Sequence, residues 1–174
     1  MESVKIQTTT TVKDMFRFQM YQMYWGLMGF VLGLLLAMAA VDLVGNFSTM
    51  PVSSRVVCIL LLLLILVVNP FVLYSRSKKQ VAAMELDTVP MELTLDSAGL
   101  FLTQGGASGS VSWSEVTKLA VLKKMMIFYM GRRQIHLVPL ERVEPQTVDA
   151  AVEAVKTFAP GVKVADKRKK RRKR

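Results

Sequence analysis

Residues 56–74 read VVCILLLLLILVVNPFVLY, and this stretch determines the class of the whole protein. Its only strongly polar side chain is Asn69. A helix of about 20 apolar residues spans a bilayer core, whereas a small soluble fold does not easily cover a helix that is apolar on every side. Each Leu, Ile, Phe or Val contributes about −0.3 to −0.6 kcal/mol to insertion, which outweighs Asn69 and Pro70 near one end. We therefore predict a transmembrane helix over residues 56–74.

A second apolar stretch precedes it over residues 25–44. At a rise of about 1.5 Å per residue, a helix of this length also crosses a bilayer core. The connector, residues 45–55 (GNFSTMPVSSR), is short and polar. The two helices are therefore predicted to form an antiparallel transmembrane hairpin.

The basic residues around the hairpin predict its orientation. The connector contains a single basic residue, Arg55, which could pair with Asp42 or be hydrated by lipid headgroups. The outer flanks of the two helices contain Lys5, Lys13, Arg17, Arg76, Lys78 and Lys79. Because basic residues collect on the cytoplasmic side of membrane proteins, we expect both termini in the cytoplasm and the connector outside.

Small residues recur at spacings of three and four along the first predicted helix. A helix places them on one face, where they let another helix approach closely. We favour the second helix of the same chain as the partner, and a second copy in a homo-oligomer is the alternative. The residues of this small-residue stripe are Gly26, Gly29, Gly33, Ala37 and Ala40.

Asn69 and Pro70 interrupt the second predicted helix near its inner end. Proline lacks a backbone donor and tends to kink a helix. We expect a structural kink in which the Asn69 amide bonds the freed carbonyls. The alternative is a functional site, because a polar residue inside a membrane is often functional.

The charge of the chain is concentrated at its C-terminus. The 174 residues carry a formal charge of +10, and eight consecutive cations account for most of it. Such a run repels itself, so residues 161–174 are predicted to form a disordered polybasic tail. This tail either binds membrane anions or stays solvated and only reinforces the cytoplasmic orientation, and the two hypotheses carry equal weight. The cations are Lys167, Arg168, Lys169, Lys170, Arg171, Arg172, Lys173 and Arg174.

The N-terminal segment, residues 1–24, is predicted to contain a short strand followed by a helix. Residues 1–10 alternate weakly, and Thr11 and Asp14 resemble a capping box with Asp in place of Glu. Residues 15–25 are rich in aromatic residues and methionine. They fit either an interfacial helix or the inner end of the first membrane helix with its aromatic belt.

A basic linker over residues 75–83 is expected to lead into a cytosolic domain over residues 84–160. Its first part alternates with period two, with Met91, Leu93 and Leu95 on the apolar side. Six short strands are expected in an antiparallel meander, with a turn at residues 96–99 and a flexible loop at 104–110. The spacing of Val148, Ala151, Val152, Val155 and Phe158 predicts a closing helix after Pro145. The fold class is thus an α+β membrane protein whose domain has a pleckstrin-homology-like layout.

Several segments resemble the YcxB-like bacterial membrane proteins. They are Asp14-Met-Phe-Arg-Phe18 ahead of two membrane helices, Leu93-Thr-Leu-Asp-Ser-Ala-Gly-Leu100, Trp113-Ser-Glu-Val116 and Leu137-Val-Pro-Leu140. The resemblance implies a location in the bacterial cytoplasmic membrane. It also implies a C-terminal domain similar to bacterial pleckstrin-homology-like domains. It supplies no catalytic residues, because no established activity of the family carries over.

The residues do not assemble a catalytic or metal site. His136 is the only histidine and Cys58 the only cysteine, so a His/Cys metal cluster is excluded and no cofactor is predicted. Glu92 and Asp96 share one face of a strand, and a solvated face explains them better than a catalytic pair. Trp113 fits a core anchor better than an exposed ligand platform. Because nucleophile, base and orienting group do not come together, we expect no enzyme.

The leading function hypothesis is a membrane-anchored interaction module. In it, the hairpin holds the β domain at the inner leaflet, where it binds a protein partner or lipid headgroups. The alternatives are a tether for nucleic acid or the ribosome through the tail, and a small transporter or channel subunit. The tail has no aromatic residues for base stacking, so binding to nucleic acid would involve the backbone only.

Overall fold

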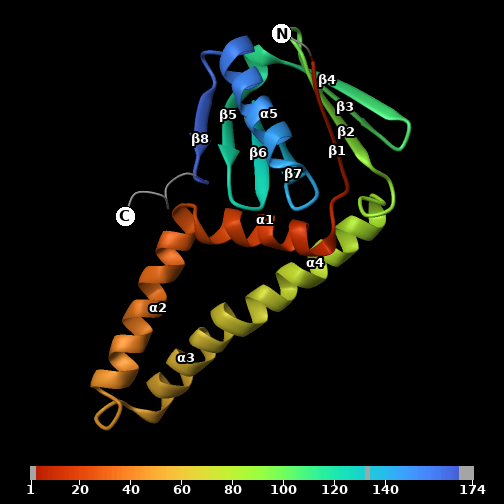
Figure 1. Ribbon diagram of the computed structural model, residues 1–174. Coiled ribbons are helices and arrows are strands. Elements are labelled where there is room, and N and C mark those ends of the chain that lie inside the picture. The colour runs from red at the N-terminus through yellow and green to blue at the C-terminus, as the bar shows by residue number, and fades with distance from the viewer. Residues whose placement is uncertain (1–2, 132–133, 169–174) are drawn as a thin grey trace. The chain divides into compact units, whose positions relative to one another are not determined.

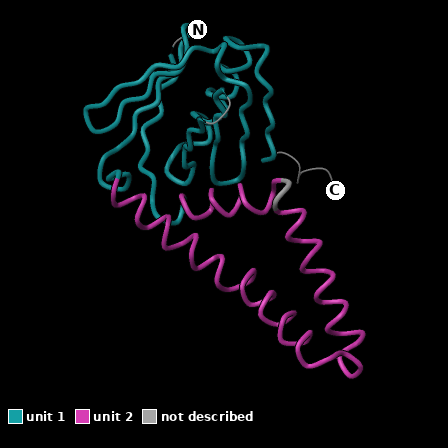
Figure 2. The backbone as a smooth tube through the Cα atoms, turned by 180° about the vertical axis from the view of Figure 1, so that it is seen from behind, with its two compact units in different colours: residues 1–14, 84–174 teal, residues 15–83 magenta. Residues whose placement is uncertain are grey.

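The protein is described by a computed structural model that places residues 3–131 and 134–168. The chain divides into two compact units, shown in different colours in Figure 2. Unit 1 comprises Met1–Asp14 and Met84–Arg174, and unit 2 comprises Met15–Ala83. The described residues form an α+β fold with helices and two sheets (Figure 1).

Sheet A of unit 1 contains four antiparallel strands in the order β1-β2-β3-β4. The N-terminal strand β1 (Val4–Thr8) pairs with β2 (Met91–Leu95), far away in the sequence. The predicted alternation on β2 is present, since Met91, Leu93 and Leu95 are buried and Glu92 is exposed. The N-terminal strand is therefore an integral part of the domain that follows the apolar helices.

A tight hairpin replaces the flexible loop that we expected over residues 104–110. Strands β3 (Gly99–Gln104) and β4 (Ala107–Ser112) pair along their full length, and only Gly105 and Gly106 form the turn. Their φ angles are +58° and +80°. Because both central residues of this turn need positive φ, two adjacent glycines make a two-residue hairpin possible. The expectation of a loop was wrong because we took the glycine residues as a sign that the whole segment is flexible.

The predicted turn at residues 96–99 is confirmed. Asp96 Oδ1 accepts hydrogen bonds from the backbone N–H groups of Ala98 and Gly99, at 2.7 and 3.1 Å. Gly99 has φ +158°, and a Cβ atom there would lie 2.2 Å from the carbonyl oxygen of Val111. Only glycine allows β4 to approach β3 this closely.

Sheet B has the strand order β7-β6-β5-β8. The antiparallel strands are β5 (Val116–Val121), β6 (Met125–Met130) and β7 (Gln134–Pro139), and β8 (Lys163–Asp166) runs parallel to β5. The expected single meander is thus divided into two sheets. The division falls at the short 3-10 helix η2 (Trp113–Glu115), which ends β4 and begins β5.

Helix α5 (Pro145–Phe158) forms as predicted, with Pro145 in its first turn. Its stripe of Val148, Ala151, Val152 and Val155 is buried. The chain then returns as β8, so residues 163–166 are part of sheet B rather than of a tail. Composition gave no signal for this strand because its pairing with β5 is parallel and distant in sequence.

One hydrophobic core joins both sheets and α5. Leu93, Leu95 and Leu100 come from sheet A, and Leu119 and Phe128 come from sheet B; all five are at most 1% exposed. The buried face of α5 belongs to the same cluster. Unit 1 therefore contains the continuous apolar core that a small domain needs for stability.

The regular elements of unit 2 are all helices. Its elements are α1 (Val12–Tyr24), α2 (Leu27–Gly45), α3 (Val52–Leu63), the π-helical turn η1 (Leu64–Val68) and α4 (Asn69–Ala83). Helix α4 continues through residues 75–83, which we expected to form a linker. Helix α1 begins with the predicted capping box, in which the Thr11 hydroxyl donates to Asp14 Oδ2 at 2.6 Å and the Asp14 N–H donates to Thr11 Oγ1 at 3.3 Å.

Candidate functional site

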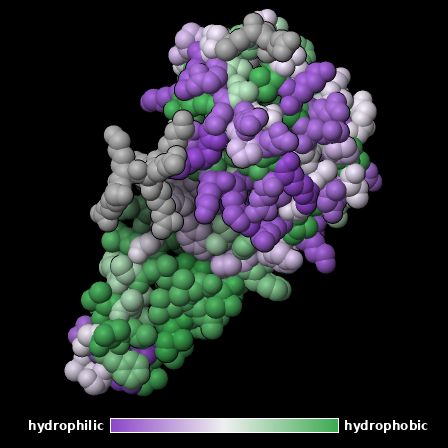
Figure 3. Space-filling view, in the orientation of Figure 1, coloured by the Kyte–Doolittle hydropathy of each residue, from purple (hydrophilic) through white to green (hydrophobic). Residues whose placement is uncertain are grey.

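The outstanding feature of unit 2 is an exposed apolar surface on its helices. Figure 3 shows it as a continuous area of hydrophobic residues. A soluble monomer rarely exposes so many large apolar side chains together, so such a surface indicates a membrane or a binding partner. Residues of this surface that are at least 40% exposed include Phe30, Leu34, Met38, Val41, Val57, Leu60, Leu63, Leu64, Leu66, Val67 and Phe71.

Among the described residues, one helix is long and apolar enough to cross a membrane. It is the continuous 32-residue helix Val52–Ala83, formed by α3, η1 and α4, and only 6% of its most apolar stretch is buried. The core helix of a soluble protein would instead be mostly buried. The helix is about 48 Å long, so its apolar part is long enough to span a bilayer core of about 30 Å.

The first predicted membrane helix has a different form from the one expected. Residues 12–24 and 29–45 are long and apolar enough to cross a membrane only when the two helices are taken together, and these helices are bent by 73° relative to each other. Helix α1 is therefore a separate helix and not the inner end of a straight membrane helix. The second span of the predicted hairpin remains a prediction.

The interruption at Asn69 and Pro70 takes the form of a π-helical turn. In η1 each N–H bonds the carbonyl five residues earlier, as the N–H of Asn69 does with the carbonyl of Leu64. The next carbonyl in this pattern is that of Ile65, but Pro70 has no N–H to offer it. The Tyr24 hydroxyl donates to this carbonyl instead, at 3.2 Å.

The side chain of Asn69 does not bond the freed carbonyls, contrary to the predicted kink. Its Nδ2 atom donates to Met23 Sδ at 3.2 Å. Tyr24 has the role that we assigned to Asn69, and it comes from α1, so sequence proximity could not identify it. The polar groups around Ile65 thus hold α1 against the π-helical turn.

We predict that Tyr24→Phe destabilises unit 2 by about 0.6 to 2 kcal/mol, since it removes the donor to the Ile65 carbonyl in an apolar environment. Unfolding of the full chain in mixed micelles by sodium dodecyl sulfate measures this loss. Tyr74→Phe is the matched control, because Tyr74 is 49% exposed and its ring contact with Phe16 does not need the hydroxyl. Equal effects of the two substitutions would contradict this role of Tyr24.

The connector between α2 and α3 is organised by Arg55. Its Nε donates to the carbonyl of Met50 at 3.0 Å, and its Nη2 donates to the carbonyl of Ser48 at 3.4 Å. The guanidinium also lies over the ring of Phe47, 4.8 Å from the centroid. Arg55 therefore stabilises the folded conformation of the connector. Asp42 takes no part in these three contacts.

The small-residue stripe of α2 does not pack against a second helix of this unit as we preferred. Gly33, Ala37 and Ala40 are exposed, and a Cβ atom at Gly33 would have no other atom within 4 Å. Gly26 and Gly29 instead lie close to the end of α1, where a Cβ at Gly29 would be 2.1 Å from the carbonyl oxygen of Tyr24. Gly29 is buried, as is Ala39, which lies outside the predicted stripe and is 9% exposed.

The described part of the basic tail is held by unit 1. The Lys167 N–H donates to the carbonyl of Val121 at 2.9 Å. The Arg168 guanidinium bonds Asp166 and Asp149, each at 2.8 Å. The hydrogen bond with Asp166 is the main cause that raises the pKa of Arg168. Residues 169–174 of the predicted lipid-binding run lie outside the described residues.

The other sequence candidates lie apart or have structural partners. Trp113 is buried, its Nε1 donates to the carbonyl of Asp96 at 2.8 Å, and its ring contacts Phe158. Its interpretation as a core anchor is confirmed. His136 lies on β7, where burial lowers its pKa. Among the described residues, no three His, Cys, Asp or Glu side chains form a group that could hold a metal ion.

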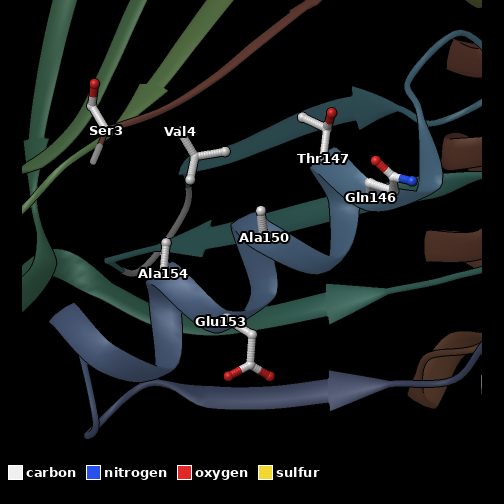
Figure 4. Close-up of a pocket in the computed structure, with 7 residues that line it drawn as sticks. All are labelled: Ser3, Val4, Gln146, Thr147, Ala150, Glu153 and Ala154. Atoms are coloured by element: carbon white, nitrogen blue, oxygen red, sulfur yellow. The ribbon is translucent and has the colours of Figure 1, made fainter. Parts of the chain in front are cut away.

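A shallow pocket of unit 1 lies between the start of β1 and one face of α5 (Figure 4). Ala150 and Ala154 form its apolar part, and Thr147 and Gln146 lie towards one end. Glu153, also at its border, is paired with Lys156 at 2.9 Å. These residues offer a small apolar contact surface that is open to solvent and do not form a site for chemistry.

These observations define an α+β protein that combines a long, exposed apolar helix with a β-sheet unit that has its own core. Residues 95–152, about a third of the chain, match the family model of the YcxB-like protein, so the resemblance seen in the sequence is confirmed. The match extends from the end of β2 into α5. No curated protein matches the chain, and no solved structure matches it either.

Proposed function

We propose that the protein is an integral membrane protein of the bacterial cytoplasmic membrane that presents unit 1 as an interaction module for a protein or lipid headgroups. The exposed apolar helix Val52–Ala83 is the single observation that carries this proposal. Water does not solvate such a surface favourably. Removing apolar surface from water stabilises the protein by about 25 cal/mol per Å². The length of the apolar part of the helix matches the thickness of a bilayer core, so we propose that lipid tails cover its apolar surface.

In this proposal α2 is the second span, and the two spans form a hairpin with both termini in the cytoplasm. The polar end of α4 supports this orientation, because Arg76, Lys78 and Lys79 are exposed directly beyond the apolar part. Helix α1 then lies in the interface, where the stacked rings of Tyr21 and Trp25 suit the headgroup region.

The layout of unit 1 supports a comparison with pleckstrin-homology-like domains. Two four-stranded sheets share a core with one C-terminal helix. The parallel strand β8 after this helix is an addition to that layout. We propose this comparison for the architecture alone, and it assigns no ligand.

The C-terminal cations are the proposed contact with anionic lipid. Each basic residue near an anionic surface contributes about 1 kcal/mol to binding. Arg168 is already engaged with two carboxylates, so it contributes less than the residues beyond it. Nucleic acid offers the same negative charge, and it is the alternative partner of this segment.

Crosslinking in native membranes tests the proposed module. We expect the full chain to crosslink a defined protein or anionic lipid through unit 1, and a chain that ends at Asp166 to lose the lipid adducts only. Adducts that disappear on nuclease treatment would favour the nucleic-acid alternative. Adducts no different from those of an unrelated two-span membrane protein would contradict the interaction module.

A further inference from the structure

The two sheets of unit 1 end in four edge strands, β1, β4, β7 and β8. Natural sheets protect such edges with charge, proline, short length or a covering element, because an open edge pairs with other chains. Strand β1 has Lys5 exposed and lies against α5, and β8 is four residues long and contains Lys163 and Asp166. Strand β7 ends at Pro139, and its last three residues are buried.

Strand β4 lacks all of these protections. Its six residues are Ala107, Ser108, Gly109, Ser110, Val111 and Ser112, without charge or proline, and all but Val111 are exposed. Within the described part of the chain, no strand pairs with its outer edge. Strand β4 is therefore the edge of unit 1 that is open to another strand.

The hairpin geometry identifies the backbone groups at this edge. A two-residue turn is closed by a hydrogen-bonded pair, here Gln104 with Ala107, and bonded pairs then alternate along the ladder. Ala107, Gly109 and Val111 thus bond β3. The N–H and C=O groups of Ser108, Ser110 and Ser112 point away from β3, towards the open edge.

The side chains of β4 indicate which strand would pair with it. Recognition of a foreign peptide by an added strand relies on pockets for alternate side chains, and serine, glycine and alanine form no such pockets. Pairing of β4 with itself needs none. The absence of charge also means that no like charges face each other across such a pair.

We propose that β4 pairs antiparallel with β4 of a second copy, about a two-fold axis through Ser110. In this register Ser110 faces Ser110 of the partner subunit, and Ser108 faces Ser112 of the partner subunit. Each of these pairs exchanges two hydrogen bonds, so the contact forms about six. Sheet A then continues from one copy into the other.

Disulfide crosslinking tests the register. Residues of a hydrogen-bonded pair have Cα atoms about 5.5 Å apart, within the range of about 4.4 to 6.8 Å that a disulfide bridges. We expect Ser110→Cys, in the full chain with Cys58→Ser, to form a crosslinked dimer on mild oxidation of native membranes. Thr103→Cys is the matched control, because Thr103 is exposed on the same face of β3 but would lie about 20 Å from its copy.

No dimer with Ser110→Cys, or equal dimer with Thr103→Cys, would overturn the proposal. A disulfide between the new cysteine and a protein of different mass would also overturn self-pairing, since it would assign the edge to a foreign strand.

Charge at the two-fold axis provides a second test. Ser110→Lys places two lysines face to face, so the dissociation constant of the dimer should rise at least tenfold, as measured by native mass spectrometry of the full chain released from detergent. Thr103→Lys should leave it within twofold. A monomeric wild-type protein, or a dimer unchanged by Ser110→Lys with native circular dichroism, would overturn the proposal.

Discussion

Replacing Trp113 with alanine is expected to lower the free energy of unfolding of unit 1 by about 3 to 5 kcal/mol. The side chain is 9% exposed, and its ring lies 6.5 Å from that of Phe158 on the closing helix. Its Nε1 atom also satisfies the Asp96 carbonyl in the turn between β2 and β3. Since domains are stable by only about 5 to 15 kcal/mol, this loss leaves unit 1 close to unfolding.

Hydrogen exchange in the full chain measures this loss, because amides of β2, β3 and α5 should exchange faster together. The full chain is needed, since a fragment beginning at Met84 lacks β1, which pairs with β2. Ser114→Ala is the control at an exposed neighbouring residue and should change stability by less than about 0.5 kcal/mol. Unchanged exchange in Trp113→Ala would refute the anchoring role.

The second large effect is expected from Leu64→Arg, near the middle of the helix Val52–Ala83. Arginine at the centre of a membrane helix costs about 2.5 to 3.5 kcal/mol, and the loss of leucine adds about 0.3 to 0.6. Insertion should fall markedly, and the fraction of protein that alkaline carbonate extracts from membranes should rise. Ser53→Arg, near the polar connector, should leave extraction unchanged.

Leu64 distinguishes a membrane helix from a soluble one because it is 58% exposed. On the surface of a soluble protein, arginine at such a position would be neutral or would improve solubility. Wild-type and Leu64→Arg proteins that both remain in the carbonate-soluble fraction would show that the helix does not cross a membrane.

The regular strands were predictable because side-chain alternation records which face is buried. Met91, Leu93 and Leu95 on β2 and the stripe of α5 are such patterns, and the structure confirms both. The division into two sheets was not predictable, because it depends on the backbone of Trp113–Glu115 rather than on periodicity. The parallel strand β8 was missed because it has only four residues. So short a segment shows no clear alternation of polar and apolar side chains and does not reveal a partner strand far away in the sequence.

The candidate sites were less predictable than the fold. An interruption of the helix at Asn69 and Pro70 was predicted, but the donor that satisfies Ile65 comes from Tyr24, on another helix. The small-residue stripe was a correct description of spacing, yet spacing does not say whether a face is covered. Gly33 is exposed. Gly29 must be glycine because a Cβ atom there would collide with the backbone of Tyr24.

Cysteine labelling of intact cells tests the central proposal, that a hairpin anchors unit 1 on the cytoplasmic side. Ser48→Cys in the connector and Ser97→Cys in the turn after β2 are placed separately in a Cys58→Ser background, since both serines are exposed. An impermeant thiol reagent should label the cysteine at position 48 in intact cells, and the one at position 97 only after the membrane is opened. Labelling of position 97 but not of position 48 in intact cells would contradict the account.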